Sequence, residues 1–257
     1  MPYHRRDMIL LFTDFGFEGP YVGQMKAVLA SAAPGETVID LMHDAPRHDP
    51  RSAAYLLAAL VPDMPPGAIC VAVVDPGVGG ARPLVIVEAD GRWFTGPGEG
   101  LFEILQRQAE SARQWRIDWR PPRLSPSFHG RDLFAPVAAR LARGEVPAVT
   151  ERTDGWRTDP SRPGADWPDD LPAILWFDRF GNAVTGLRGA SCDSGTVIRV
   201  GDTVVRHARV FSAVPRGEIF WYENSSGMVE IAVNCGSAAD VLNLHAGAAI
   251  RVEAPAS

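Results

Sequence analysis

The feature of this sequence that most constrains its fold is an alternation, near the start of the chain, of short apolar runs with segments of helical period. Each apolar run is continuous, which is typical of a strand buried on both faces of a parallel sheet. The helical segments repeat their apolar residues at helical spacing, and the first of them stops at a Pro-Gly pair. This order predicts a βαβαβ beginning and a layered α/β domain. The predicted strands are residues 8–13, 37–41 and 68–74, and the predicted helices are residues 21–33 and 50–60.

The next part of the chain continues this domain. Residues 84–88 and 93–95 predict a hairpin, because a short polar turn containing Asp-Gly separates two apolar runs. Residues 99–109 and 128–143 have helical periodicity. Pro136 lies inside the second of these helices, and proline is tolerated only in the first turn of a helix or at a kink.

The composition changes after residue 150, where Pro, Gly and Asp crowd a stretch with few apolar residues. Beyond it, short alternating or apolar runs replace the helical period and predict strands. We therefore expect an α/β layered sheet domain over residues 7–152, a linker over 153–171 and a smaller, all-β, barrel-like domain over 172–257. The strands predicted in this last domain are residues 173–177, 196–200, 203–206, 208–211, 218–222, 228–233 and 248–252.

Composition narrows the class of protein and its partners. Hydrophobic residues make up 46% and charged residues 22% of the 257 residues, which excludes a disordered or collagen-like chain. The formal net charge of −6 disfavours nucleic acid or an anionic membrane as a partner. The apolar run 8–12 is too short for a signal peptide, and no run is long enough to span a membrane. We therefore expect a soluble, cytoplasmic protein.

The cysteines and histidines give no sign of a metal site. Cys70, Cys192 and Cys235 are isolated in the sequence, and their odd number indicates a reducing compartment. His43 and His48 share a polar loop, but their spacing matches no known ligand pattern, so we expect no bound metal. The sequence has no GxSxG, Walker or HExxH motif, so it gives no support to a serine hydrolase, a nucleoside triphosphatase or a zincin.

Polar loops follow the predicted parallel strands, at the edge of the sheet where ligands bind. Asp14 ends the first strand, where its carboxylate can bind a ribose diol or a metal, or cap a turn. Asp75 follows the third strand in a glycine-rich loop, and Arg82 can pair with it for catalysis or simply to fix the loop. This loop lacks the GxGxxG spacing, and a strand follows it, which argues against NAD. His129, followed closely by an Arg and an Asp, begins a predicted helix.

Short motifs are spread along nearly the whole chain, and their order and spacing are jointly specific. They are Thr13-Asp14-Phe15-Gly16, Tyr21-Val22-Gly23, Asp75-Pro76-Gly77-Val78-Gly79 with Arg82, Phe128-His129-Gly130-Arg131-Asp132 through Ala135-Pro136, Asp178-Arg179-Phe180-Gly181-Asn182, and Asn224-Ser225 with Glu230-Ile231-Ala232. Together they resemble the S-adenosyl-L-methionine (SAM) hydroxide adenosyltransferases, which are related to SAM-dependent fluorinases and chlorinases. That family's architecture, an α/β domain and a smaller β-barrel, agrees with the fold that periodicity predicts.

The resemblance implies a reaction in which water or hydroxide attacks the 5′ carbon of SAM to give adenosine and L-methionine without a cofactor. The family's Asp-Arg-His set corresponds to Asp75, Arg82 and His129. Because arginine is not a base at neutral pH, Arg82 is expected to orient Asp75 and the water. Either His129 or Asp75 then removes or polarises the proton. The sulfonium leaves as a neutral thioether, so the enzyme needs mainly to desolvate and aim the water.

The resemblance also implies how the substrate is held and how subunits assemble. Members of the family form trimers in which each site lies between the first domain of one subunit and the second domain of a neighbour, so a homotrimer is implied here. The implied substrate contacts are Asp14 with the ribose hydroxyls, Asp178 and Asn182 with the methionine ammonium and carboxylate, Ser225 nearby, Phe180 and Tyr222 as stacking partners of adenine, and Tyr21 in the wall of the pocket.

The sequence departs from the family at three positions. Gly98 and Glu99 replace the Asp and Asn of the family's Pro-Asp-Asn-Gly-Leu motif, and Gly186 replaces a second Asn. These differences bear on rate and exact substrate more than on class. Two alternatives stay open: a SAM-dependent halogenase, which His129 disfavours because halide-using relatives lack it, and a non-catalytic SAM or adenosine sensor. The Asp-Arg-His set disfavours the sensor, because a protein that only binds needs no group to activate water.

Overall fold

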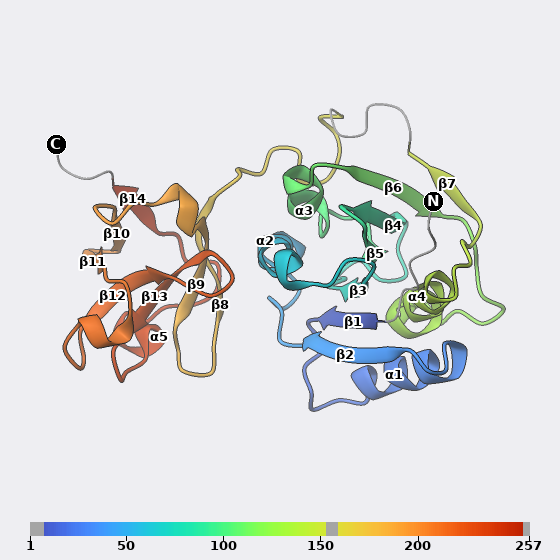
Figure 1. Ribbon diagram of the computed structural model, residues 1–257, viewed down its shortest axis with the longest axis horizontal. Coiled ribbons are helices and arrows are strands. Elements are labelled where there is room, and N and C mark those ends of the chain that lie inside the picture. The colour runs from blue at the N-terminus through green and yellow to red at the C-terminus, as the bar shows by residue number, and fades with distance from the viewer. Residues whose placement is uncertain (1–7, 153–158, 254–257) are drawn as a thin grey trace. The chain divides into compact units, whose positions relative to one another are not determined.

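The computed structural model describes residues 8–152 and 159–253 of the chain (Figure 1). The chain divides into two compact units, Met1–Asp166 and Trp167–Ser257. The predicted fold class is confirmed: the first unit is a layered α/β domain and the second is built on a curled β-sheet. Residues 153–158 of the predicted linker lie outside the described residues, whereas Arg162 of the same segment pairs with Glu103 of the first unit.

The first unit contains a seven-stranded mixed sheet. The strands at one side, in the order β2-β1-β3-β5, are parallel, and β4, β6 and β7 continue the sheet in antiparallel pairings. β1 and β3 are buried almost throughout, as their continuous apolar sequences predict. The strands are β1 (Met8–Thr13), β2 (Thr37–Met42), β3 (Ile69–Val73), β4 (Leu84–Ala89), β5 (Arg92–Pro97), β6 (Ala112–Ile117) and β7 (Val149–Glu151).

Four helices accompany this sheet: α1 (Tyr21–Ala32), α2 (Pro50–Leu60), α3 (Glu103–Gln108) and α4 (Ala135–Ala142). α1 contacts α4, and α2 contacts α3 (Figure 1). Ile9 and Leu11, which share one face of β1, join the buried residues of α1 and α4 in one core. α2 begins where its sequence predicts, because the Asp49 side chain accepts a hydrogen bond from the Ser52 backbone at 3.0 Å and Pro50 occupies the first turn.

Two predicted helices begin later than their periodicity suggests. The helix expected over 99–109 starts at Glu103. The helix expected over 128–143 consists of one π-helical turn, Gly130–Phe134, followed by α4, which places Pro136 in the first turn of α4 as its chemistry requires. A π turn inserts an extra residue into the helix, and such turns are frequent at functional sites. Here it lies directly after His129.

The second unit holds a seven-stranded sheet in the order β14-β10-β11-β12-β13-β9-β8. Residues 247–250 hydrogen-bond to the beginning of β8, so the sheet curls back toward its own first strand. Ile174, Trp221 and Ile231 are fully or almost fully buried in its core. The strands are β8 (Leu171–Phe177), β9 (Ala183–Arg188), β10 (Val197–Val200), β11 (Thr203–His207), β12 (Ile219–Glu223), β13 (Met228–Val233) and β14 (Arg251–Glu253), and a one-turn helix, α5, spans Ala238–Val241.

The sequence missed some elements and placed one strand wrongly. β6, β7 and β9 were not predicted, because their sequences mix polar and small residues with few apolar ones. The strand predicted over 208–211 is wrong, since Phe211–Ala213 forms a 3-10 turn there.

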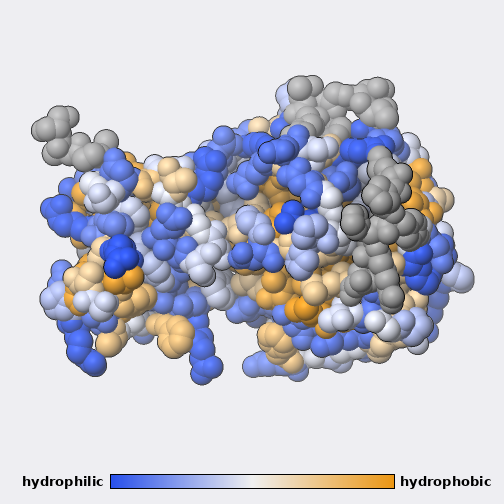
Figure 2. Space-filling model, in the orientation of Figure 1, coloured by the Kyte–Doolittle hydropathy of each residue, from blue (hydrophilic) through white to orange (hydrophobic). Residues whose placement is uncertain are grey.

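Hydrophilic side chains cover most of the face in Figure 2, and apolar side chains reach it only in patches. Within the described residues, no helix is both long and apolar enough to cross a membrane.

Candidate active site

A cavity of about 420 Å³ in the first unit lies where β1 and β3 end. Because both strands are parallel, the loops that follow them meet at one edge of the sheet. The structure therefore brings together Asp14, Tyr21, Asp75 and His129, which come from three separate parts of the sequence. We call this the first cavity; its lining is Asp14, Phe15, Tyr21, Arg47, His48, Val73, Asp75, Val78, Ser127, Phe128, His129 and Gly130.

Arg82 joins Asp75 to His129 behind the wall of the first cavity. Its Nε donates to Asp75 Oδ1 at 2.5 Å, and its Nη2 donates to the second carboxylate oxygen of Asp75. The same Nη2 lies 3.0 Å from His129 Nδ1. The side chains of Arg82 and Asp75 are only 1% and 5% exposed, so this pair is held away from solvent. The three groups form one buried hydrogen-bonded chain, which is stronger and better oriented than an exposed ion pair.

This contact determines the tautomer of His129. A guanidinium only donates hydrogen bonds, so Nδ1 must accept and the neutral ring must carry its hydrogen on Nε2. Burial and then the positive charge of Arg82 lower the pKa of His129 below its usual value of 6.5, although the charges of Asp75 and Asp132 oppose this. The ring is therefore neutral near pH 7 and presents an N–H donor.

Glu99 lies beside the same arginine. Its Oε2 and the Cδ of Arg82 lie 2.9 and 3.2 Å from the point that a Cβ atom on Gly77 would occupy. Only glycine fits between them without displacement, which explains this position of the glycine-rich loop. Nη1 of Arg82 is buried and has no hydrogen-bond partner among the described residues. Glu99 does not line the first cavity, so this departure from the family lies behind the site rather than in it.

Asp14 is held on the floor of the first cavity. Its Oδ2 accepts a hydrogen bond from the backbone N–H of His48 at 3.0 Å, and its side chain is 8% exposed. His48 adopts a left-handed backbone conformation, with φ of 56°, that turns this N–H toward the carboxylate. The sequence did not assign His48 to this site. The signal was present, because its loop follows β2, which neighbours β1 in the parallel sheet.

Aromatic side chains form one wall of the first cavity. Phe15, Tyr21 and Phe128 contact one another with ring centroids 5.3 to 5.9 Å apart and tilted or edge-to-face planes. Tyr21 remains half exposed, so one face of this cluster is open. Arg131 lies over the ring of Phe128 at 5.0 Å and pairs with Asp132. The wall is thus aromatic and largely apolar, and it can pack against a flat ring.

The other predicted substrate residues gather in a cavity of the second unit, of about 580 Å³. We call it the second cavity. Asp178, Phe180, Asn182 and Tyr222 line it as the sequence grouped them, whereas Ser225 lies exposed in the turn after β12 and does not line it. The complete lining is Asp178, Phe180, Asn182, Phe211, Tyr222, Val233, Cys235 and Gly236.

The loop between β8 and β9 is organised by Asp178. Its Oδ1 accepts from the backbone of Phe180 and of Asn182 at 2.8 and 2.9 Å, and its Oδ2 accepts from Asn182 Nδ2 at 2.8 Å. Asn182 is 5% exposed, yet its Oδ1 has no hydrogen-bond partner in the described chain. A buried acceptor without a donor is costly, so this oxygen is suited to a ligand N–H. Phe180 is 72% exposed and free to pack on a ligand.

Tyr222 is anchored by its hydroxyl, which donates to the buried Glu230 at 2.6 Å. Asn224 Nδ2 donates to the other oxygen of Glu230 at 2.8 Å. Burial and the hydrogen bond to Glu230 raise the pKa of Tyr222 well above its ordinary value, so the phenol stays protonated. Its ring contacts Phe211, with centroids 5.4 Å apart. Glu230 therefore fixes the orientation of the ring that borders the second cavity.

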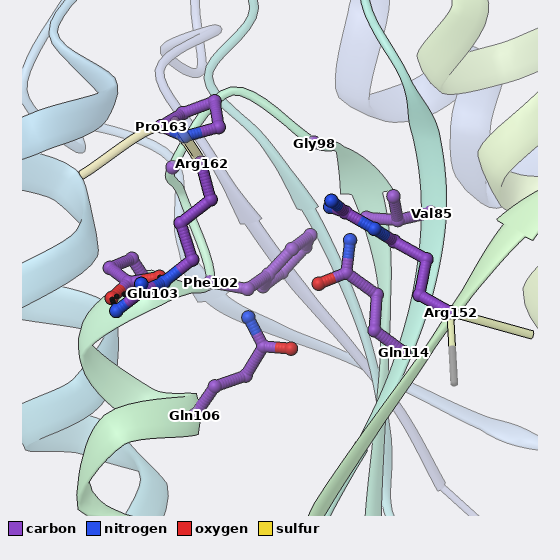
Figure 3. Close-up of a pocket in the computed structure, with 10 residues that line it drawn as sticks. Val85, Gly98, Phe102, Glu103, Gln106, Gln114, Arg152, Arg162 and Pro163 are labelled. Carbon is purple, nitrogen blue, oxygen red and sulfur yellow. Dashed lines mark hydrogen bonds and ion pairs between the residues drawn. The ribbon is translucent and has the colours of Figure 1, made fainter. Parts of the chain in front are cut away.

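The two other departures from the family have packing roles. A Cβ on Gly98 would lie 2.9 Å from Val85 Cγ1, and a Cβ on Gly186 would lie 2.6 Å from both Cβ and O of Leu171. Gly98 borders a small hollow of about 20 Å³, in which Arg162 lies against Glu103 (Figure 3), and also a neighbouring hollow of about 270 Å³. Neither glycine lines the first or the second cavity. No group of three metal-ligating side chains occurs in the part of the chain that the structure describes.

Comparison with known families accounts for both units. Residues 9–151 match the model of the SAM hydroxide adenosyltransferase N-terminal domain, and residues 172–251 match that of the C-terminal domain. The chain belongs to the SAM hydroxide adenosyltransferase family. This membership confirms the resemblance that the sequence motifs indicated.

Relatives within and beyond the SAM hydroxide adenosyltransferases match over nearly the whole chain. An (R)-S-adenosyl-L-methionine hydrolase from Thermus thermophilus is 41% identical over 95% of this chain and 98% of its own length, and one from Salinispora arenicola is 36% identical over 94% and 96%. A fluorinase from Actinopolyspora mzabensis is 25% identical over 97% and 98%.

Solved structures share this fold. A conserved protein from Thermotoga maritima superimposes with a TM-score of 0.80 at 28% identity, covering 95% of this chain and 99% of its own. A conserved protein from Thermus thermophilus superimposes with a TM-score of 0.73 at 37% identity, over the same shares. Among the relatives named above, the two hydrolases, at 41% and 36% identity, are more similar in sequence to this chain than the fluorinase, at 25%.

Proposed function

We propose that this protein is a SAM hydrolase, which converts S-adenosyl-L-methionine and water to adenosine and L-methionine. The observation that carries the proposal is the buried chain from Asp75 through Arg82 to His129, whose ends reach the first cavity. The hydrolases among its relatives support the choice of substrate and of water as the nucleophile. The sulfonium is itself the leaving group, so the reaction needs no cofactor.

The reaction is a displacement at the ribose 5′ carbon. The water oxygen forms the new C–O bond while the C–S bond breaks, and the bonding electron pair leaves with the sulfur as a neutral thioether. The attacking water becomes an oxonium as it bonds to carbon, and its proton must then move to a base. An oxonium is far more acidic than a carboxylic acid, so a carboxylate paired with arginine is basic enough to accept this proton.

The geometry favours different roles for Asp75 and His129. The neutral His129 ring carries its hydrogen on Nε2, so it is suited to donate to the water oxygen and orient a lone pair toward carbon. Asp75 accepts the proton, and Arg82 holds its carboxylate in one orientation. Both groups are prepositioned by burial, so little reorganisation accompanies the reaction.

Substrate contacts follow from the two cavities. Asp14 binds the ribose hydroxyls, and Tyr21 packs on the nucleoside in the first cavity. Asp178 and Asn182 bind the methionine ammonium and carboxylate. We assign Phe180 and Tyr222 to the adenine. Ser225 lies outside the second cavity, so its assignment close to the amino-acid group rests on the family resemblance alone. We further propose a homotrimer in which the first unit of one subunit and the second unit of a neighbour complete each site.

The test is incubation of the purified protein with SAM in oxygen-18 water, with and without chloride, followed by mass spectrometry of the products. The proposal predicts methionine and adenosine labelled at the 5′ oxygen, and no such product from an Asp75→Asn variant prepared in the same way. A chlorinated nucleoside would instead make the protein a halogenase. Calorimetric binding of SAM without any product would make it a sensor.

A further inference from the structure

A chain of polar side chains runs through the first unit beneath Asp14. Lys26 of α1, the single lysine of the sequence, donates to Asp40 Oδ2 at 3.0 Å. Asp40 Oδ1 lies 3.1 Å from His43 Nε2, and His43 Nδ1 lies 2.7 Å from the hydroxyl of Thr13. His43 and Thr13 are fully buried. The chain thus links a helix, an edge strand and the end of β1, directly beside the residue that we place on the ribose.

Each hydrogen in this chain has one consistent direction. Burial raises the pKa of Asp40, but hydrogen bonds from His43 and Lys26 outweigh it and hold the pKa below its ordinary value, so Asp40 is an ionised acceptor. His43 then donates from Nε2 and accepts from the Thr13 hydroxyl at Nδ1. The Thr13 oxygen keeps a lone pair for the backbone N–H of Phe15, 3.3 Å away. Both ring nitrogens and the hydroxyl are therefore satisfied without a ligand.

Backbone hydrogen bonds join the residues on both sides of Asp14 to the loop that carries His43. The N–H of Gly16 donates to the carbonyl of His43 at 2.6 Å, and the N–H of Ala45 donates to the carbonyl of Thr13 at 3.1 Å. The loop that carries His43 also supplies the His48 N–H that binds the Asp14 carboxylate. The position of Asp14 is consequently determined by the residues before and after it and by the loop that faces it.

We propose that His43 is a positioning residue that acts through Thr13 to hold Asp14 in place for the ribose hydroxyls. The inference rests on the proposed function, because it takes Asp14 as the ribose contact. The arrangement resembles an Asp-His-hydroxyl nucleophile in its order only, since the Thr13 hydroxyl is fully buried and already accepts a backbone N–H. His43 must therefore affect the substrate through the position of the loop that carries Asp14.

The test compares two ligands and a pair of matched variants by titration calorimetry. Adenosine carries the ribose hydroxyls, and 2′,3′-dideoxyadenosine lacks them. Thr13→Val removes the hydroxyl at nearly constant volume, whereas Thr13→Ser keeps it. Misplacing a charged hydrogen-bond acceptor weakens adenosine binding by about tenfold in Thr13→Val. Affinity for dideoxyadenosine stays unchanged in that variant, and Thr13→Ser binds both ligands as the parent protein does.

A second variant guards against a folding defect in the first. His43→Gln can still donate to Asp40 from its amide nitrogen but has no acceptor atom at the position of Nδ1, so it should repeat the Thr13→Val pattern. Asp14→Ala supplies the reference for loss of the ribose contact. If Asp14→Ala weakens the binding of adenosine but not of dideoxyadenosine, and neither Thr13→Val nor His43→Gln does so, the positioning role is wrong while the proposed site stands. If Asp14→Ala binds both ligands as the parent protein does, Asp14 is not the ribose contact and both ideas fall.

Discussion

Arg82 determines the hydrogen-bonding roles of Asp75 and His129. By donating to both oxygens of Asp75 and to Nδ1 of His129, it fixes the carboxylate as an acceptor and the imidazole as a neutral ring with an Nε2 hydrogen. The family resemblance implied that all three residues belong to one set, but it left open which of Asp75 and His129 handles the proton. The direction of a single hydrogen bond supports Asp75 in that role.

His129→Ala should lower kcat for SAM hydrolysis by about two to four orders of magnitude, the usual contribution of a group that positions or transfers a proton. Its affinity for adenosine should change by no more than a few fold, because we assign the His129 ring to the attacking water and not to the nucleoside. Initial rates and calorimetry measure the two effects. His245→Ala, at an exposed histidine outside both cavities, is the control and should behave as the parent protein does. Equal losses of turnover and binding would mean that His129 only shapes the cavity.

The pH dependence of turnover follows from the lowered pKa of His129. Burial and the charge of Arg82 keep the ring neutral below pH 6.5, so turnover should hold as the pH passes 6.5 and fall only at lower pH. The free energy of unfolding should depend on pH in the same direction. As the pH falls, His129 is protonated in the unfolded chain before it is protonated in the folded protein, so the contribution of His129 to stability is present above pH 6.5 and is lost at lower pH. A pH profile of kcat, with His129→Gln lacking this limb, checks the prediction. An inflection above pH 6.5 would contradict it.

At the scale of elements, a π turn borders the first cavity, and a close backbone approach packs β8 against β9. The π turn Gly130–Phe134 follows His129, and β9 lies so close to the start of β8 that no side chain fits at Gly186. The family's asparagine at that position would therefore meet Leu171 in this chain. Gly98 and Gly186, which differ from the family's residues, are surrounded by closely packed atoms, and neither of them lines the first or the second cavity.

Gly186→Ala should lower the free energy of unfolding by about 1–3 kcal/mol, because its Cβ would overlap Leu171 and force the strands apart. Gly23→Ala is the matched control: Gly23 lies within α1, and nothing lies within 4 Å of an added Cβ. Alanine is the better helix former, so this change should stabilise the protein by about 0.5–1 kcal/mol. Denaturant unfolding of both variants measures these opposite signs. Equal stability of Gly186→Ala and the parent would show that β8 yields easily.

At the scale of the whole molecule, each unit carries a cavity lined by some of the predicted substrate contacts. Asp14, Asp75 and His129 line the first, and Asp178 and Asn182, which we assign to the amino-acid group, line the second. Both cavities are built on loops at strand ends, which a rigid sheet can hold in place. The proposed trimer would make each complete site depend on two subunits.

Mixed subunits test this dependence. Asp75→Asn inactivates the first cavity, and Asn182→Ala removes the unpaired acceptor of the second. If sites form between subunits, unfolding and refolding the two inactive variants together should restore part of the activity, because some sites receive two intact halves. Light scattering should give about three times the 27.8 kDa chain mass. Absence of restored activity in a confirmed mixed trimer would place both halves of each site in one subunit.

The sequence by itself determined the layered α/β beginning and the β-rich second part, and its motifs indicated the family that implies the proposed catalytic set. Periodicity reports which face of an element is buried, and short motifs keep reactive residues at fixed separations along the chain. It could not supply β6, β7 and β9, whose mixed sequences become strands only because neighbouring strands offer them hydrogen bonds.

Only the tertiary structure decided how side chains far apart in the chain meet. The His48 N–H reaches Asp14 because β1 and β2 are parallel neighbours, and His43 lies beneath that contact for the same reason. The tautomer of His129 depends on an arginine 47 residues away. Such contacts depend on register and on the course of loops, which are set by packing of the whole unit and leave no local period in the sequence.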